Sequence, residues 1–248
     1  MKQSIFILLF LIPLISISKS LSDTNGVKAL REKHRTMASP DIPGNLVINL
    51  GFNVLSNKAS TMDTQFWGSK SLGLYYTFSL NNESSSFSFN AGIGVGLEKY
   101  ALKGNTALNQ KTDPTLGHIA YIETLADDIN VKKSKLAANY LEVPVELRFY
   151  SNKERREKGV YVALGASAGV LYQSHTKLKT KQDGVNYQVK NRTDFELNPL
   201  RFSAIARFGF AGFSFYYRMG LSELFNSGNG PEAAPAKSSS FGISFVGF

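Results

Sequence analysis

The residues best suited to nucleophilic or acid–base chemistry lie far apart in the chain. His118, Asp127 and Asp128 share one polar stretch, and Ser174 and His175 share another. A serine that is activated by a histidine and oriented through a carboxylate could hydrolyse or transfer an acyl group. No spacing typical of a known hydrolase joins these residues. We therefore expect solvated loop residues and no catalytic residue, with a lipid-modifying enzyme or a protease as the alternative.

The sequence shows no metal, cofactor or thiol signature. The absence of cysteine excludes disulfides, thiol catalysis and thiolate metal sites. The adjacent pair Asp127 and Asp128 is only a weak cation signal, without the spacing of a calcium loop. Gly92, Gly94 and Gly96 do not form a dinucleotide-binding loop, because the third glycine comes one residue too early for the GxGxxG motif and no βαβ pattern surrounds them. We expect neither a metal nor a cofactor.

Seven charged residues have a spacing with a different chemical meaning. Each lies at the polar parity of a segment whose other parity is apolar, whereas lysines are concentrated in connectors and segment ends. Buried charges need partners, and three glutamates can pair with four arginines. We interpret this set as an ion-pair network on the inner side of a barrel: Glu98, Glu142, Glu146, Arg148, Arg201, Arg207 and Arg218.

The segment Asn139–Tyr150 carries three of these charges and shows the pattern of the whole chain. Its odd positions are apolar and its even positions are mostly polar, which is typical of a β-strand with two different faces. Seven more segments alternate in the same way, and each is long enough to cross a bilayer at a tilt. They cover about 45–55, 70–80, 87–100, 160–173, 200–210, 213–221 and 240–248.

The connectors between these segments alternate between short and long, as in transmembrane barrels. A soluble, secreted ligand-binding barrel is the alternative, but it would hold its apolar face inside and scatter lysine over its outer face. The predicted fold class is therefore all-β: an eight-stranded antiparallel up-and-down transmembrane β-barrel with long extracellular loops. Such a narrow barrel is filled by side chains and leaves no aqueous pore.

The first 20 residues predict a cleaved export signal. Lys2 is followed by an apolar run, and the small residues Ser18 and Ser20 are spaced for a signal peptidase. We expect a signal peptide over 1–20, a periplasmic leader over 21–43 and the barrel over 44–248. The charge of +9 could indicate nucleic acid binding. Export instead favours anionic lipid or surface glycan, so we expect no nucleic acid partner.

Two long connectors predict local structure. Ile119, Ile122, Leu125 and Ile129 recur at a spacing that favours a short amphipathic helix. Farther on, an alternating pattern continues beyond Tyr172, turns at 182–184 and returns, which predicts a β-hairpin above the membrane. This hairpin could bind an acidic protein or a glycan, with a mobile loop as the alternative. Its candidate binding residues are Lys177, Lys179, Lys181 and Tyr187.

Three stretches resemble the outer-membrane β-barrel proteins of Bacteroidetes-type bacteria, in particular the PorT-like and OmpX-like group. They are 41–53, 89–100 and 139–150, the last with Pro144 inside the strand. The resemblance runs from about Asp41 to the end and implies the fold and a Gram-negative outer membrane, but no catalytic residues. It also implies a possible role in protein secretion and recognition of Phe248 by the barrel-assembly machinery.

Phe248 does not share a face with Phe241, Ile243 and Phe245, so we expect a bulge or a register slip near Val246. We expect a non-enzymatic outer-membrane protein, which contacts outer-membrane lipid and acts in surface interaction or as an accessory of protein secretion.

Overall fold

The computed structural model describes residues 44–80, 85–152, 159–182, 184–210 and 212–247. The predicted signal peptide, the predicted leader and Phe248 lie outside these residues. No helix in the described part of the chain is long and apolar enough to cross a membrane. The 3-10 helix η2 covers Pro231–Ala233. The strands are β1 Asn45–Ser56, β2 Lys70–Ser79, β3 Phe87–Ala101, β4 Thr106–Asp113, β5 Gly117–Thr124, β6 Asn130–Tyr150, β7 Val160–Gln182, β8 Val185–Asn191, β9 Leu200–Phe210, β10 Phe213–Gly220 and β11 Lys237–Val246.

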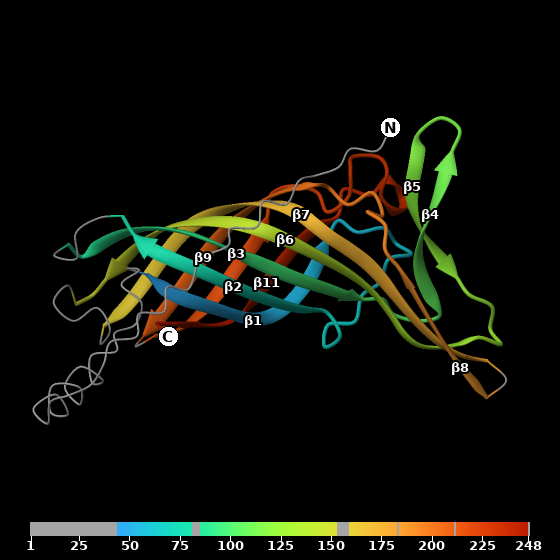
Figure 1. Ribbon diagram of the computed structural model, residues 1–248, viewed down its shortest axis with the longest axis horizontal. Coiled ribbons are helices and arrows are strands. Elements are labelled where there is room, and N and C mark those ends of the chain that lie inside the picture. Colours follow the sequence, from blue (N-terminus) through green and yellow to red (C-terminus); the bar gives the residue numbers. More distant parts are fainter. Residues whose placement is uncertain (1–43, 81–84, 153–158, 183, 211, 248) are drawn as a thin grey trace, which may run out of the picture. The chain divides into compact units, whose positions relative to one another are not determined.

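Eight of the strands form a closed antiparallel barrel (Figure 1). Their order around the wall is β6-β3-β2-β1-β11-β10-β9-β7, and the additional pairing of β6 with β7 closes the circle. All eight lie where the sequence predicts strands; β6 and β7 continue beyond their membrane-spanning segments, and β11 begins at Lys237, three residues before its predicted start. Alternation is a local property of the chain, and for this reason it locates the strands well.

The barrel presents a band of apolar side chains on its outer side and polar side chains on its inner side. Leu164 at 71% exposure and Phe215 at 59% are typical of the outer side. The inner side carries small polar residues beside the charged ones, among them Asn49, Ser203 and Ser244, all buried. Short turns join strands at one end of the barrel, where β1 begins and β11 ends, and long connectors join them at the other.

The predicted helix between β3 and β6 is wrong. Residues 117–124 instead form β5, which pairs antiparallel with β4 as a separate two-stranded sheet. The β-branched Ile119 and Ile122 favour a strand, and pairing with β4 satisfies the backbone N–H and C=O groups. Ala120 is buried and Ile122 packs against the same apolar cluster, so this face of the hairpin is held by tertiary contacts.

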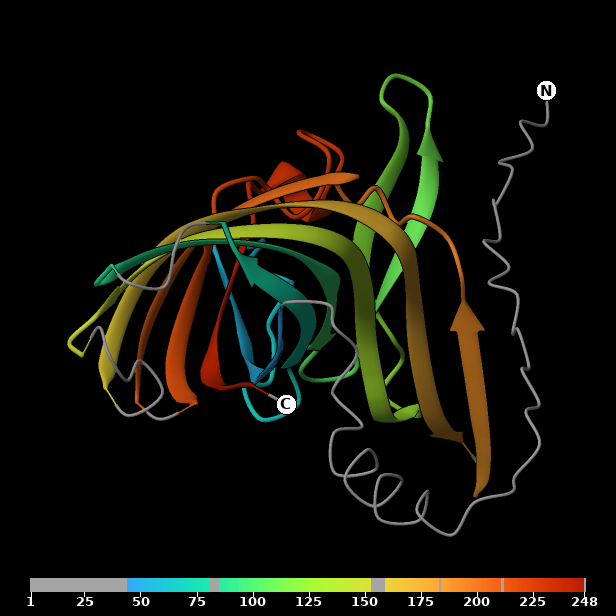
Figure 2. The same ribbon diagram turned by 60° about the vertical axis from the view of Figure 1, so that its left-hand side comes forward.

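Strands β6 and β7 continue past the ends of their neighbours, and β8 pairs with the extension of β7 (Figure 2). The predicted hairpin is therefore present. The pairing of β6 with β7 shifts between Asn139 and Tyr140, which leaves one extra residue near Tyr172. A bulge of this kind exchanges the two faces of the strand beyond it. As a result, Ser174 and Thr176 are buried, while Lys177 and Lys179 lie on the opposite face.

Neither the bulge nor the register slip expected near Val246 occurs in the paired part of β11. Strand β11 pairs with β1 in continuous register from Lys237 to Val246. The extended backbone ends one residue later, at Gly247, whose φ of 93° is a conformation that favours glycine.

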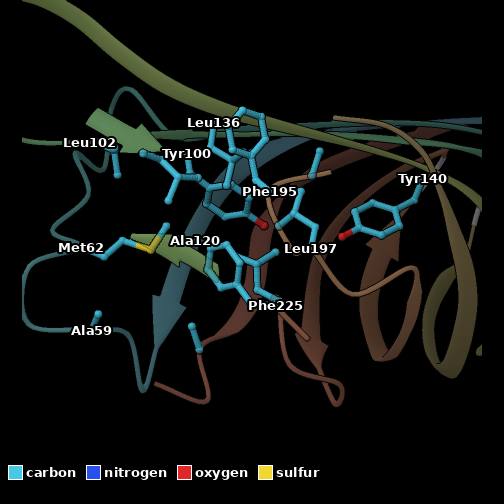
Figure 3. Packing of buried hydrophobic residues seen from close by; sticks show 14 residues of the cluster. Ala59, Met62, Tyr100, Leu102, Ala120, Leu136, Tyr140, Phe195, Leu197 and Phe225 are labelled. Atoms are coloured by element: carbon cyan, nitrogen blue, oxygen red, sulfur yellow. The ribbon is translucent and has the colours of Figure 1, made fainter. Parts of the chain in front are cut away.

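The long connectors contribute an apolar core at their end of the barrel (Figure 3). Met62 comes from the β1–β2 connector, Phe195 and Leu197 follow β8, and Phe225 precedes β11. They pack with Tyr100, Leu108, Leu136 and Tyr140 from the strands and with Ala59, Leu102, Ala120, Ala138, Leu224 and Ala236. Because these side chains are almost fully buried, the long connectors form a packed cap.

Polar contacts fix this cap as well. The Glu232 carboxylate accepts hydrogen bonds from the backbone N–H groups of Ser60 (2.9 Å) and Thr61 (3.2 Å), which joins the last connector to the first. Hydrogen bonds from Thr61 and Ser60 lower the pKa of Glu232 to about 2. Lys58 of the first connector and Lys103 of the β3–β4 connector bind Asp63 and lower the pKa of its carboxyl.

Candidate functional site

The barrel interior holds all seven charged residues predicted to face it, and each is buried. Four of them form a cluster near the long-connector end. Arg218 contacts Glu98 at 2.5 Å and Glu142 at 3.0 Å, and Arg201 contacts Glu98 at 2.6 Å and also Glu142. Two carboxylates and two guanidinium groups balance in charge. The four residues come from β3, β6, β9 and β10, so the cluster connects opposite walls across the lumen.

A second cluster lies nearer the short-turn end. Glu146 accepts hydrogen bonds from Arg148 Nε (3.0 Å) and Arg207 Nε (2.7 Å). The guanidinium of Arg207 also donates to Asn49 (3.0 Å) and Ser244 (2.8 Å) on β1 and β11. In the described structure Arg148 and Arg207 share the single carboxylate of Glu146, so this cluster has one positive charge in excess. The neutral acceptors Asn49 and Ser244 stabilise that charge by accepting hydrogen bonds from Arg207.

Tyrosine side chains complete the first cluster, and the sequence analysis missed them. Tyr75 donates to Glu142 at 2.5 Å, and Tyr100 donates to Glu98. The guanidinium of Arg201 lies 3.8 Å from the ring centroid of Tyr140, a cation–π contact. Tyr100 and Tyr140 lie at the same parity as the glutamates on their strands, and Tyr75 lies at the small, polar parity of β2. This parity was the signal that could have identified them.

Glycine makes room for the first cluster. A Cβ atom at Gly96 would lie 3.0 Å from both Arg201 Nη2 and Glu142 Oε2. A side chain there would displace the ion pairs, so the absence of a side chain at Gly96 leaves the space that Arg201 and Glu142 occupy. Between the two clusters, an internal cavity of about 10 Å³ is lined by Asn49, Tyr75 and Ser167 among others. That volume holds roughly one water molecule.

The candidate catalytic residues do not form a site. Ser174 and His175 are consecutive in β7 and so point to opposite sides of the sheet. Ser174 donates to the carbonyl of Thr193 (2.5 Å). Burial, together with the charges of Lys190 and Arg192, lowers the pKa of His175. His118 is exposed on β5 and contacts Thr112.

The acidic residues considered with them do not contribute either. Asp127 and Asp128 are exposed, and Asp128 accepts from Gln182 (3.0 Å). Across the described ranges, no three histidine or acidic side chains gather as metal ligands would.

The predicted binding residues of the hairpin lie on a three-stranded sheet formed by the extended part of β6, β7 and β8. Lys177 is opposite Lys135 on one side and Lys190 on the other, and Lys179 is opposite Lys133. Lys181, at the far end of β7, is exposed. Tyr187 on β8 is opposite Thr180, and 53% of its surface is exposed.

The closed eight-stranded topology agrees with a family match. The family model of the outer membrane protein beta-barrel domain matches residues 36–226. The chain belongs to this family. The outer apolar band of this outer-membrane β-barrel therefore faces lipid, and its long connectors are extracellular, as in such barrels generally. The soluble-barrel alternative is thereby excluded.

Two solved structures are similar to this outer-membrane barrel. One is the attachment invasion locus protein Ail of Yersinia pestis, in complex with the heparin analogue sucrose octasulfate, with 13% identity, a TM-score of 0.33 and coverage of 83% of this chain and 99% of that one. The other is a mutant porin of Rh. blastica, with 7% identity, a TM-score of 0.19 and coverage of 82% and 98%. No curated protein matches the chain.

The interior geometry predicts that this outer-membrane barrel does not conduct ions as a porin does. The path along the barrel axis is filled by the two ion-pair clusters and the apolar cap. The cavity that remains between the clusters has a volume of only about 10 Å³. We expect purified protein in planar bilayers to show no large, stable conductance. Reproducible steps of porin size would contradict a filled lumen.

Proposed function

We propose that this outer-membrane barrel is a non-enzymatic surface-interaction protein, whose binding element is the extracellular sheet of β6, β7 and β8. The observation that supports this proposal is the position of β8. It is the last strand of its sheet, paired with β7 on one side only, and every residue of Val185–Asn191 is exposed. Such an open edge can accept a strand from another protein through backbone hydrogen bonds.

The charge of this sheet supports an acidic partner. Like charges directly opposite each other are unfavourable in a sheet, yet Lys133 faces Lys179 and Lys135 faces Lys177. A bound acidic protein segment would offset this repulsion. The other face of the sheet is apolar where Leu178 is opposite Val189, and both line a cavity of about 80 Å³ together with Leu108 of β4. Lys179 lies on the face of β7 opposite to Leu178, whereas Lys177 also contributes to the lining of this cavity.

A role as an accessory of protein secretion is one form of the same proposal. The resemblance of Asn139–Tyr150 to PorT-like barrels supports it, and the strand added at β8 would then belong to a secretion component or to a transported protein. The proposal involves no catalytic step, because the histidine, serine and aspartate side chains are separated.

Deletion of the hairpin is the first test. Thr176 is paired with Asn191, so residues 177–190 can be replaced by Asn-Gly. The two new residues then form a hairpin turn between Thr176 and Asn191. We expect the barrel to fold and to lose the proteins that crosslink to the full-length protein on cells. Retention of every crosslinked protein by the folded variant would show that the partner binds elsewhere.

A charge reversal separates binding from folding. Lys179→Glu faces Lys133 and should leave the sheet at least as stable, because it replaces a like-charge pair with an opposite one. We expect capture of an acidic partner to fall about tenfold or more, because attraction becomes repulsion. The matched control is Lys111→Glu on β4, with the same change in net charge. An equal loss in both variants would indicate an effect of overall charge.

A further inference from the structure

A groove of about 540 Å³ lies on the lipid-facing wall of the barrel, on the outer side of β11, β1, β2 and β3. This volume is in the range of ligand pockets. Its apolar lining consists of outward side chains in adjacent register: Leu50 is paired with both Leu72 and Ile243, and Leu72 is paired with Leu97. Phe52 forms part of the wall. The groove is therefore apolar across four strands.

Two lysines form the extracellular end of the groove. Lys70 and Lys99 line it, and both are exposed. The pairing of Ser71 with Glu98 places Lys70 and Lys99 side by side just beyond it. Among the described residues neither lysine has a carboxylate partner, in contrast to Lys58 and Lys103, which share Asp63.

Further positive charge lies next to this pair. Lys135 on β6 donates to the carbonyl oxygen of Gly68 (3.2 Å). Burial and the nearby charges of Lys133, Lys99 and Lys70 lower the pKa of Lys135. The lysines thus gather above the lipid-facing wall, and repulsion between them is reduced when an anion binds.

Aromatic residues mark the level of these lysines relative to the membrane. Phe52 stacks on Phe66 with ring centroids 4.8 Å apart, and Trp67 packs against Phe66 at 5.3 Å. Trp67 is 77% exposed. Tryptophan and other aromatic residues form girdles at the membrane–water interfaces of barrels. The groove consequently lies at the depth of acyl chains, and Lys70 and Lys99 lie at the depth of headgroups.

From this arrangement we propose that the groove is a binding site for a net-anionic, phosphate-bearing acylated lipid of the outer leaflet. An acyl chain lies along Leu50, Leu72 and Ile243, and the phosphate binds between Lys70 and Lys99. This site is separate from the β8 edge and does not depend on the proposed partner. It gives the barrel a fixed lipid contact at one position of its circumference.

The test is native mass spectrometry of the full chain, purified in detergent and incubated with equal amounts of bisphosphorylated lipid A and phosphatidylethanolamine. We expect the protein to retain lipid A selectively. Each lysine near a membrane surface contributes about a fivefold factor in affinity, so Lys70→Gln with Lys99→Gln should lower retention about twenty-five-fold. Leu72→Trp, which fills the groove without removing charge, should also lower it severalfold.

The control is Lys111→Gln with Lys132→Gln, which removes the same charge at two exposed positions away from the groove. It should retain lipid A as the unmodified chain does. Heat-dependent migration in detergent gels verifies folding of every variant. Unchanged retention in the Lys70 and Lys99 variant, an equal loss in the control, or equal retention of phosphatidylethanolamine would each overturn the proposal. Unchanged retention in folded Leu72→Trp would do so as well.

Discussion

Arg218→Met is expected to lower the free energy of unfolding of the barrel by about 3 to 5 kcal/mol, the usual cost of removing one partner of a buried ion pair. The arginine is the shared partner of Glu98 and Glu142, and both carboxylates are almost completely buried. Without it, two negative charges share the single guanidinium of Arg201. The cost comes mainly from the charge that loses its partner in a medium of low dielectric constant.

Three variants separate this cause from loss of packing. Arg218→Lys keeps the charge and should cost less than Arg218→Met, although one ammonium cannot reproduce the fork of donors. Adding Glu142→Gln to Arg218→Met restores charge balance, so the double variant should lose less than the sum of the single variants. Lys111→Met on the exposed side of β4 is the surface control and should change stability by no more than about 1 kcal/mol, because it removes only an exposed cation–π contact with Tyr121.

Urea unfolding in lipid vesicles measures these differences. The chain has one tryptophan, Trp67, which lies at the extracellular end of the wall and is a convenient fluorescence reporter. Equal unfolding midpoints for Arg218→Met and Lys111→Met would contradict a stabilising role for the interior network.

Leu164→Arg is expected to destabilise the barrel in a bilayer by about 2 to 4 kcal/mol, because a charge on the lipid face near the membrane midplane is poorly solvated. Leu164 has 71% of its surface exposed and lies between the two ends of the membrane band. If this surface faced water, the same substitution would change stability by about 0.5 kcal/mol or less. The experiment therefore measures which solvent surrounds the outer wall.

Leu116→Arg is the matched control, because Leu116 is 56% exposed in the turn between β4 and β5, away from the membrane band. It should leave the free energy of unfolding almost unchanged in the same vesicles. Similar small effects at positions 164 and 116 would contradict the lipid-facing assignment of the wall.

The strands and the sidedness of their charges follow from the sequence, because both depend on local alternation. In Asn139–Tyr150 the even positions, Glu142, Glu146 and Arg148 among them, point to one side of the strand whatever the rest of the chain does. In a membrane, only the lumen side can hold these charges, so parity alone distinguishes the inner wall from the lipid-facing wall. The strand ends at the short turns were predictable for the same reason, whereas at the long connectors β6, β7 and β11 extend beyond their predicted segments.

The choice of ion-pair partners depends on the tertiary structure. Arg201 on β9 meets Glu98 on β3 and Glu142 on β6, and none of these strands is a neighbour of β9 in the wall. Their meeting is a consequence of barrel closure and of the register of every strand between them. No local pattern carries that information.

Two other features were decided by long-range contacts. The spacing of Ile119 and Ile122 also fits a helix, but pairing with β4 and burial in the cap make it a strand. The extra residue near Tyr172 exchanges the faces of β7, so that Lys177 and Lys179 lie on the outward side beside Lys135 and Lys133. The sequence alone thus determines which side chains share a face of each strand. Only the closed barrel determines what that face meets, because register, bulges and contacts across the lumen depend on residues far away in the chain.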